Sequence, residues 1–191
     1  MQTRMIDKQW SEKYPKVGKG PVSTEPYVSQ EYFERERDVI FRNCWLNVGR
    51  VDEILKPGEF FVRELEICRT SILVVRGKDG AVRAFHNVCP HRGNTLVLEE
   101  RGKVPGKFAC NFHCWIFNTE GKLTGVPDES NFFDLEKANI ELSGIHCDIW
   151  EGFIFVHLGA NPKESLREYL GGVATQLDGS PFQEMRLLRK Y

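Results

Sequence analysis

The sequence lacks a long apolar run, an excess of charge of either sign and any internal repeat. Its densest apolar stretch, FIFVHL at 153–158, is far shorter than the roughly 18 residues that suggest a membrane-spanning helix. The 26 Lys and Arg residues balance 27 Asp and Glu residues, so we expect neither a nucleic-acid partner nor a membrane. The N-terminus also lacks the apolar core of a secretory signal, which predicts a cytoplasmic protein.

Disulfide bonds are not expected either, although the chain of 191 residues contains six cysteines. Without a secretory signal, cysteines in a chain of this size are more often reduced, metal-bound or catalytic than paired. Three of the six lie between Cys89 and Trp115, together with two of the five histidines. This segment is therefore the first candidate for a functional site.

The chain divides into four predicted parts. Residues 1–28 form an extended arm, and 29–44 form a helix that Ser29 caps. Residues 45–158 form a mainly β domain of roughly eight strands, with tight turns at GKDG (77–80) and NTEGK (118–122). Residues 159–191 hold a second helix, with Asn161 as its cap and Gly171 at its end, and then the start of a further strand. The predicted strands are the runs WLNVGRV, EFFVREL, TSILVVR, AVRAFHNV, KFAC, WIFN, KLTGV and IWEGFIFVHL.

Two short turns each contain one thiol and one imidazole, Cys89-x-His91 and Cys110-x-x-His113. A Cys2His2 zinc site usually takes its thiolates as one close pair and its histidines as another, whereas here each turn is mixed. In a [2Fe–2S] centre of the Rieske kind, two histidines replace two thiolates on one iron, which matches two mixed turns directly. Zinc and ordinary core residues remain as alternatives, and the spacing favours the two-iron cluster.

Two segments, NVCPHRGN (87–94) and CNFHCWIFNTEGKLTGVP (110–127), resemble the Rieske motif in the large subunit of ring-hydroxylating non-haem iron oxygenases. The likeness extends to GPVSTEPYVSQEYFERERDVIFRNCWLNVGRV (20–51) and LVVRGKDGAVRAFHNV (73–88). It implies a Rieske fold of small antiparallel sheets, with two hairpin loops that bind the cluster. It also implies that Cys89 and Cys110 bind one iron, and that His91 and His113 bind the other at the surface.

The resemblance further implies electron transfer from a ferredoxin or flavin reductase to a mononuclear Fe(II) in a catalytic domain of the same or a neighbouring subunit. That iron's motif, D-x-x-H-x(4)-H, is absent here, so no catalytic residue is expected in this chain. We therefore expect the N-terminal part of an aromatic-ring (di)oxygenase large subunit, as a fragment or a split gene product, in a homotrimer or larger assembly. A free-standing Rieske ferredoxin and a zinc-stabilised interaction module are the alternatives.

Several residues depart from the family pattern or carry a weaker expectation. Respiratory Rieske proteins have cross-linking cysteines where this chain has Asn94 and Phe112, so no loop disulfide can form and a low potential is expected. Cys114 replaces a glycine, which implies either a negative φ or local strain, and we expect a buried, inert thiol there. We expect Arg92 to pair with a carboxylate and Trp115 to pack beneath the loops.

Overall fold

Residues 14, 20–177 and 179–185 are described by a computed structural model, and they fall into two units, 1–35 and 36–191. Short helix α2 (Glu25–Val28) precedes α3 (Gln30–Val39). Ser29 caps α3 as predicted, because its Oγ accepts a hydrogen bond from the Tyr32 backbone N–H at 3.1 Å. The helix ends at Val39 rather than residue 44 and is followed by a 3-10 turn at Phe41–Asn43. Most of the arm predicted for 1–28 lies outside the described residues.

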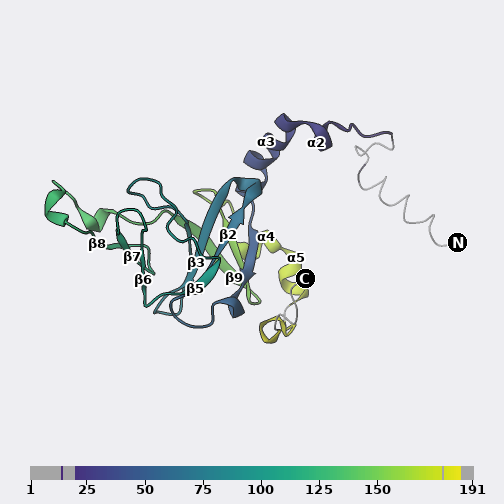
Figure 1. Cartoon of the computed structure of the whole chain (residues 1–191). Helices are drawn as coiled ribbons and strands as arrows, with labels where there is room; N and C mark the ends of the chain where they lie inside the picture. Colours follow the sequence, from purple (N-terminus) through teal and green to yellow (C-terminus); the bar gives the residue numbers. More distant parts are fainter. Residues whose placement is uncertain (1–13, 15–19, 178, 186–191) are drawn as a thin grey trace. The chain divides into compact units, whose positions relative to one another are not determined.

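Two antiparallel sheets make up the rest of the fold, and they confirm the predicted mainly β class (Figure 1). The larger sheet has the order β1 (Leu46–Arg50), β10 (Phe153–His157), β9 (Gly144–Trp150), β4 (Val82–His86), β3 (Thr70–Arg76), β2 (Glu59–Leu65) and β5 (Arg101–Lys103). The smaller sheet has the order β6 (Lys107–Ala109), β7 (Ile116–Asn118) and β8 (Leu123–Gly125). Further 3-10 turns occupy Val51–Glu53, Glu66–Cys68, Glu129–Asn131, Lys137–Asn139 and Phe182–Glu184.

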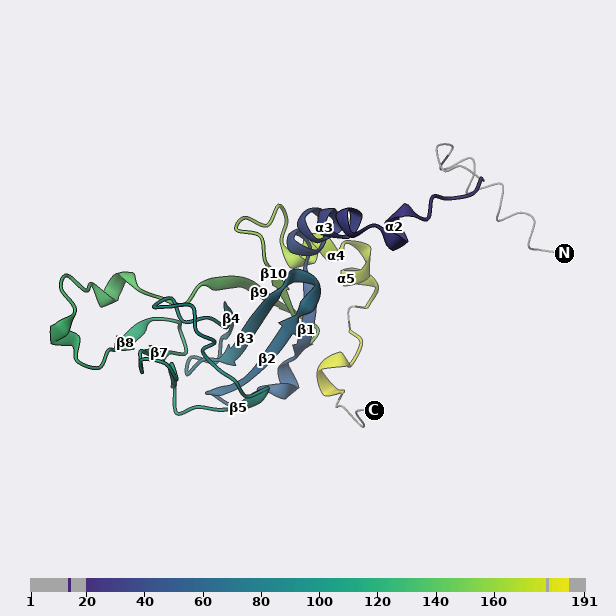
Figure 2. The same cartoon turned by 45° about the horizontal axis from the view of Figure 1, so that its top comes forward.

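Strand β2 shows why the sequence of the central strands is almost continuously apolar. Successive side chains of a strand point to opposite faces, and here both faces are buried. Phe60 and Val62 join a core cluster with Phe108 and Trp115 from the smaller sheet and its loops. Phe61 joins a second cluster on the other face, with residues of β1, β9 and β10. The smaller sheet lies at one end of the larger sheet in both views (Figure 1 and Figure 2). Cys110 and Trp115 of its β6–β7 loop belong to the first cluster.

The run IWEGFIFVHL, predicted as one strand, is two strands joined by a tight turn. Strand β9 ends at Trp150, and β10 begins at Phe153. Between them Glu151 and Gly152 have φ values of +48° and +80°, the combination that a two-residue hairpin of type I′ needs. Because Glu-Gly is not one of the preferred pairs for this turn, the sequence did not reveal it. The short strand β5 was also missed, since all three of its residues are exposed and show no apolar alternation.

The helix after the sheet begins later than predicted. Ser165, not Asn161, is the N-cap of α4 (Leu166–Leu170), and it forms a capping box with Glu168. Gly171 ends α4 with φ +52°, as expected, and α5 (Gly172–Gln176) follows directly. Residues 182–184 form a 3-10 turn instead of the predicted strand, and 186–191 lie outside the described residues. No helix in the described part of the chain is long and apolar enough to cross a membrane.

Candidate metal centre

The two mixed turns have the same backbone hydrogen bonds. In the first loop (89–94), Gly93 N–H donates to the Cys89 carbonyl at 2.9 Å, and Cys89 N–H donates to the Asn94 carbonyl at 2.8 Å. In the second loop (110–115), Cys114 N–H donates to the Cys110 carbonyl at 2.9 Å, and Cys110 N–H donates to the Trp115 carbonyl at 2.9 Å. Each loop thus closes on its own cysteine, although one histidine follows by two residues and the other by three.

The second loop is the tip of the β6–β7 hairpin, whereas the first loop is closed by a buried asparagine. Asn87 is 1% exposed, and its amide side chain both donates to the Val97 carbonyl at 2.8 Å and accepts from Val97 N–H at 2.9 Å. An isolated bridge between Val88 and Thr95 completes the base of this loop. Sequence reasoning missed Asn87, because its partner lies ten residues away and no motif connects them.

The thiols and imidazoles of the loops differ in burial. Cys89 and Cys110 are 1% and 2% exposed and belong to the core cluster beneath the loops. His113 is exposed and His91 is half-buried, with 4.7 Å between their ring centroids. The ring of Trp115 stacks on His91 at 4.3 Å, which agrees with the packing role predicted for this tryptophan. The two imidazoles therefore lie side by side on the outer side of two buried thiols.

The pKa shifts of Cys110 and His91 favour the forms that bind a metal, whereas that of Cys89 opposes its thiolate. Burial raises the pKa of the Cys89 thiol, and the neighbouring Cys110 raises it further. Burial also acts to raise the pKa of Cys110, but the backbone N–H groups of Phe112 and His113 and the Cys89 and Asn94 side chains hold it below its ordinary value. Burial lowers the pKa of His91, which favours the neutral imidazole that a metal requires.

In each loop, N–H groups of the second and third residues after the cysteine favour its thiolate. These residues are His91 and Arg92 in the first loop, and Phe112 and His113 in the second. Two cysteine sulfurs that amide N–H groups face and two imidazoles are the donor set that a Rieske [2Fe–2S] cluster needs. Among the residues that the structure describes, no three His, Cys, Asp or Glu side chains are placed to hold one metal ion.

Cys114 has the backbone strain that its replacement of glycine suggested. Its φ is +55°, and it occupies the same place in the second loop as Gly93, with φ +71°, in the first. The thiol of Cys114 is exposed, so the expectation of a buried thiol is wrong. The reason is the turn itself, which points the residue after His113 away from the core while the cysteine at its start points inward.

The surroundings of the loops differ from expectation at Arg92, and they include one residue that the sequence did not indicate. Arg92 is exposed, and no ion pair with a carboxylate is found for it within the described residues, contrary to expectation. Phe132, which follows the smaller sheet, lies 6.2 Å from the His91 ring and 6.0 Å from the Trp115 ring, both edge-on. No spacing in the sequence could have shown that this phenylalanine reaches the loops.

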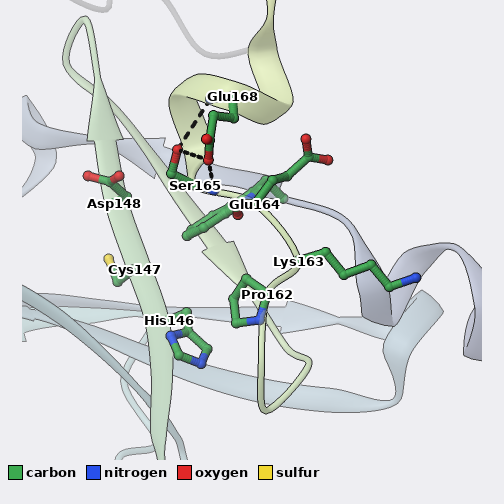
Figure 3. Close-up of a pocket in the computed structure, with 9 residues that line it drawn as sticks. His146, Cys147, Asp148, Pro162, Lys163, Glu164, Ser165 and Glu168 are labelled. Carbon is green, nitrogen blue, oxygen red and sulfur yellow. Dashed lines mark hydrogen bonds between the residues drawn. The ribbon is translucent and has the colours of Figure 1, made fainter.

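The remaining histidines and cysteines do not extend the site. His146 and Cys147 line a separate open pocket of about 450 Å³ beside α4, where Ser165 and Glu168 form the dashed hydrogen bonds of Figure 3. The His146 ring lies 2.9 Å from the Ala160 carbonyl oxygen. Burial raises the pKa of Cys147 to about 12, so this thiol stays protonated. That these residues have structural roles stays a prediction.

The fold and the paired loops define an iron–sulfur protein, and comparison with known families agrees. The pattern of the Rieske [2Fe-2S] domain family matches residues 44–147. The chain belongs to this family, and its cofactor is the Rieske [2Fe–2S] cluster. The individual ligands and the domain boundaries at 28, 44 and 158 stay predictions.

Within this family, the chain is similar to oxygenase components. It is 31% identical to the carnitine monooxygenase oxygenase subunit of Acinetobacter baumannii, over 80% of this chain and 40% of the relative. It is 38% identical to the glycine betaine monooxygenase oxygenase subunit of Pseudomonas aeruginosa, over 71% of this chain and 31% of the relative. The chain thus spans about two fifths or less of the length of these relatives.

Solved structures give the same result. The apo form of the quaternary ammonium Rieske monooxygenase CntA matches with a TM-score of 0.76 and 30% identity, over 82% of this chain and 45% of that one. Naphthalene 1,2-dioxygenase from Rhodococcus sp. also matches with a TM-score of 0.76, at 29% identity, over 82% of this chain and 36% of that one. The predicted resemblance to Rieske oxygenase subunits is confirmed.

Proposed function

We propose that this chain binds its [2Fe–2S] cluster through Cys89 and Cys110 on one iron and His91 and His113 on the other, and transfers single electrons. The observation that carries the proposal is the pairing of two equivalent loops, with both thiols in the core and both imidazoles on the outer side. When bound, such a cluster accepts and releases one electron at a time.

The chain's own residues perform three tasks in this proposal. The buried cysteines and the core cluster beneath them keep water away from the sulfur side. Trp115 holds the ring of His91 by stacking, and the Asn87 amide fixes the base of the first loop. His113 is exposed, so its ring can meet a redox partner directly.

The proposal extends to the complete oxygenase. Electrons would come from a ferredoxin or flavin reductase and pass to the mononuclear iron of an oxygenase catalytic domain, in the same or a neighbouring subunit. The relatives named above are oxygenase subunits, and one structure of a quaternary ammonium Rieske monooxygenase has been described in terms of inter-subunit electron transfer. Carnitine and glycine betaine are not aromatic whereas naphthalene is, so aromatic-ring hydroxylation and a homotrimer stay predictions from the resemblance.

The experiment is spectroscopy and metal analysis of the purified 191-residue chain. We expect a reddish-brown protein with about two iron atoms per chain and, after reduction by dithionite, an EPR signal whose mean g value is below that of the free electron. We also expect a midpoint potential below zero volts. A colourless chain that holds zinc would contradict the proposal and support an interaction module.

The oxygenase part has its own test, which is the gene sequence after Tyr191. A continuation into D-x-x-H-x(4)-H supports the oxygenase, because two histidines and a carboxylate bind non-haem Fe(II). A stop codon at that point favours a free-standing Rieske ferredoxin or a split gene product instead.

A further inference from the structure

The side chain of Asn94 connects the two cluster-binding loops. Its backbone carbonyl closes the first loop by accepting from Cys89 N–H at 2.8 Å. Its side-chain nitrogen Nδ2 lies 3.9 Å from Cys110 Sγ in the second loop and 2.8 Å from the Thr95 carbonyl oxygen. A primary amide has two N–H donors, so one hydrogen can serve each of these acceptors.

The Thr95 contact fixes which end of the amide faces the sulfur. A carbonyl oxygen only accepts hydrogen bonds, so the atom 2.8 Å from it must be the nitrogen of Asn94 and not its oxygen. The second hydrogen of the same nitrogen is then available to Cys110 Sγ. Because Asn94 is half-buried and Cys110 is 2% exposed, water competes little for this contact.

We propose that Asn94 is a positioning residue that raises the reduction potential of the centre by donating an N–H···S hydrogen bond to Cys110. The inference rests on the proposed function, because it takes Cys110 as a cluster ligand. Adding one electron from a reductant makes the cluster and its thiolates more negative, and breaks no bond of the chain. A donor aimed at a ligand sulfur stabilises the more negative state.

The size of the effect follows from the strength of such bonds. A hydrogen bond to a charged group contributes more than one between neutral groups, and only its difference between the two redox states alters the potential. We expect its loss to lower the equilibrium constant for one-electron reduction by roughly threefold to tenfold, where tenfold corresponds to about 59 mV.

The test is a redox titration of the 191-residue chain with its cluster, followed by absorption and EPR. Asn94→Leu keeps the approximate shape and removes the donor, and Asn94→Asp replaces the donor with a negative acceptor. The matched control is Asn111→Leu, since Asn111 is exposed in the second loop and its side chain makes no hydrogen bond within the described residues. We expect the wild type and the control to have the same reduction potential. The potential of Asn94→Leu should be lower, and that of Asn94→Asp should be the lowest.

Two results would overturn the inference. One is an Asn94→Leu protein with an intact EPR spectrum and the wild-type potential, and the other is an Asn94→Asp potential that is not below that of Asn94→Leu. If Asn94→Leu does not assemble the cluster, Asn94→Ala takes its place in the comparison. Failure of the proposed function is distinct, because the wild-type chain itself would then contain no [2Fe–2S] cluster.

Discussion

Replacing Cys114 by glycine should stabilise the protein, because the residue has a left-handed backbone with φ +55°. That conformation costs an L-residue about 1–2 kcal/mol. Glycine avoids this cost but gains about 0.4–1 kcal/mol of conformational freedom in the unfolded chain, which offsets part of the benefit. The net expectation is a gain of about 0.5–1 kcal/mol. For a protein of this size, that raises the apparent unfolding temperature by about 1–4 °C.

The first loop provides the mirror experiment. Gly93 has φ +71° and the same backbone hydrogen bonds as Cys114, and an added Cβ there would meet no atom within 4 Å. Gly93→Ala therefore adds backbone strain without a clash, and we expect it to lower stability by about 0.5–1 kcal/mol. Cys114→Ala keeps the Cβ and removes the thiol, so it should leave stability close to that of the wild type.

The assay is thermal unfolding at one scan rate, followed by far-UV circular dichroism and by the loss of visible cluster absorbance. All three variants should retain the spectrum of the cluster, since none changes a proposed ligand. If Cys114→Ala stabilises as much as Cys114→Gly, then the thiol and not the backbone is responsible. If Cys114→Gly lowers the unfolding temperature, then the positive φ of Cys114 does not cost the protein stability, and the reasoning fails.

Three further predictions concern the ligands, the hairpins and pH. Cys110→Ala should abolish visible absorbance and bound iron, whereas Cys68→Ala, at a buried cysteine outside the loops, should keep both. Gly121→Ala should cost about 1–3 kcal/mol more than Gly80→Ala in urea unfolding. Both glycines have positive φ, but only at Gly121 would a Cβ lie 2.5 Å from an aromatic ring, and equal losses would contradict this. Burial lowers the pKa of His86 in the folded state below its ordinary 6.5, so its stabilising contribution is complete above that value and falls as the pH decreases. The wild type should therefore lose stability more steeply than His86→Gln between about pH 7 and about pH 5, as measured by urea midpoints.

The sequence was sufficient for the class of fold and for the two loops, since both depend on local pattern. Short apolar or alternating runs indicated the central strands, and the mixed Cys and His spacing indicated the candidate ligands. Contacts between distant segments could not be read in this way. The Asn87 amide reaches Val97, and the Phe132 ring, which follows the smaller sheet in the chain, lies 6.2 Å from that of His91. Each depends on how separate segments pack, which no local spacing encodes.

Cys114 shows a second kind of limit, in which the sequence posed a choice that only backbone geometry decides. A cysteine in place of glycine left two possibilities open: a turn with a negative φ at residue 114, or a turn that keeps a positive φ there and is strained. The matching hydrogen bonds of the two loops show that the turn was kept. Both loops therefore need a positive φ at this position, which is occupied by Gly93 in the first loop and by Cys114 in the second.

The way in which the loops are supported bears on the direction of electron transfer. Cys89 and Cys110 belong to the same core cluster as Phe60 and Leu73 of the larger sheet, so the sulfur side of the centre is fixed by the packing of the whole domain. The imidazole of His113 is exposed, with the rings of Phe112 and His91 beside it at 3.8 Å and 4.7 Å. In the proposed centre, a redox partner therefore meets the histidine-bound iron first. A change of charge or of hydrogen bonding by that partner would act on the exposed imidazole, while hydrogen bonds to the buried thiolates set the potential from within.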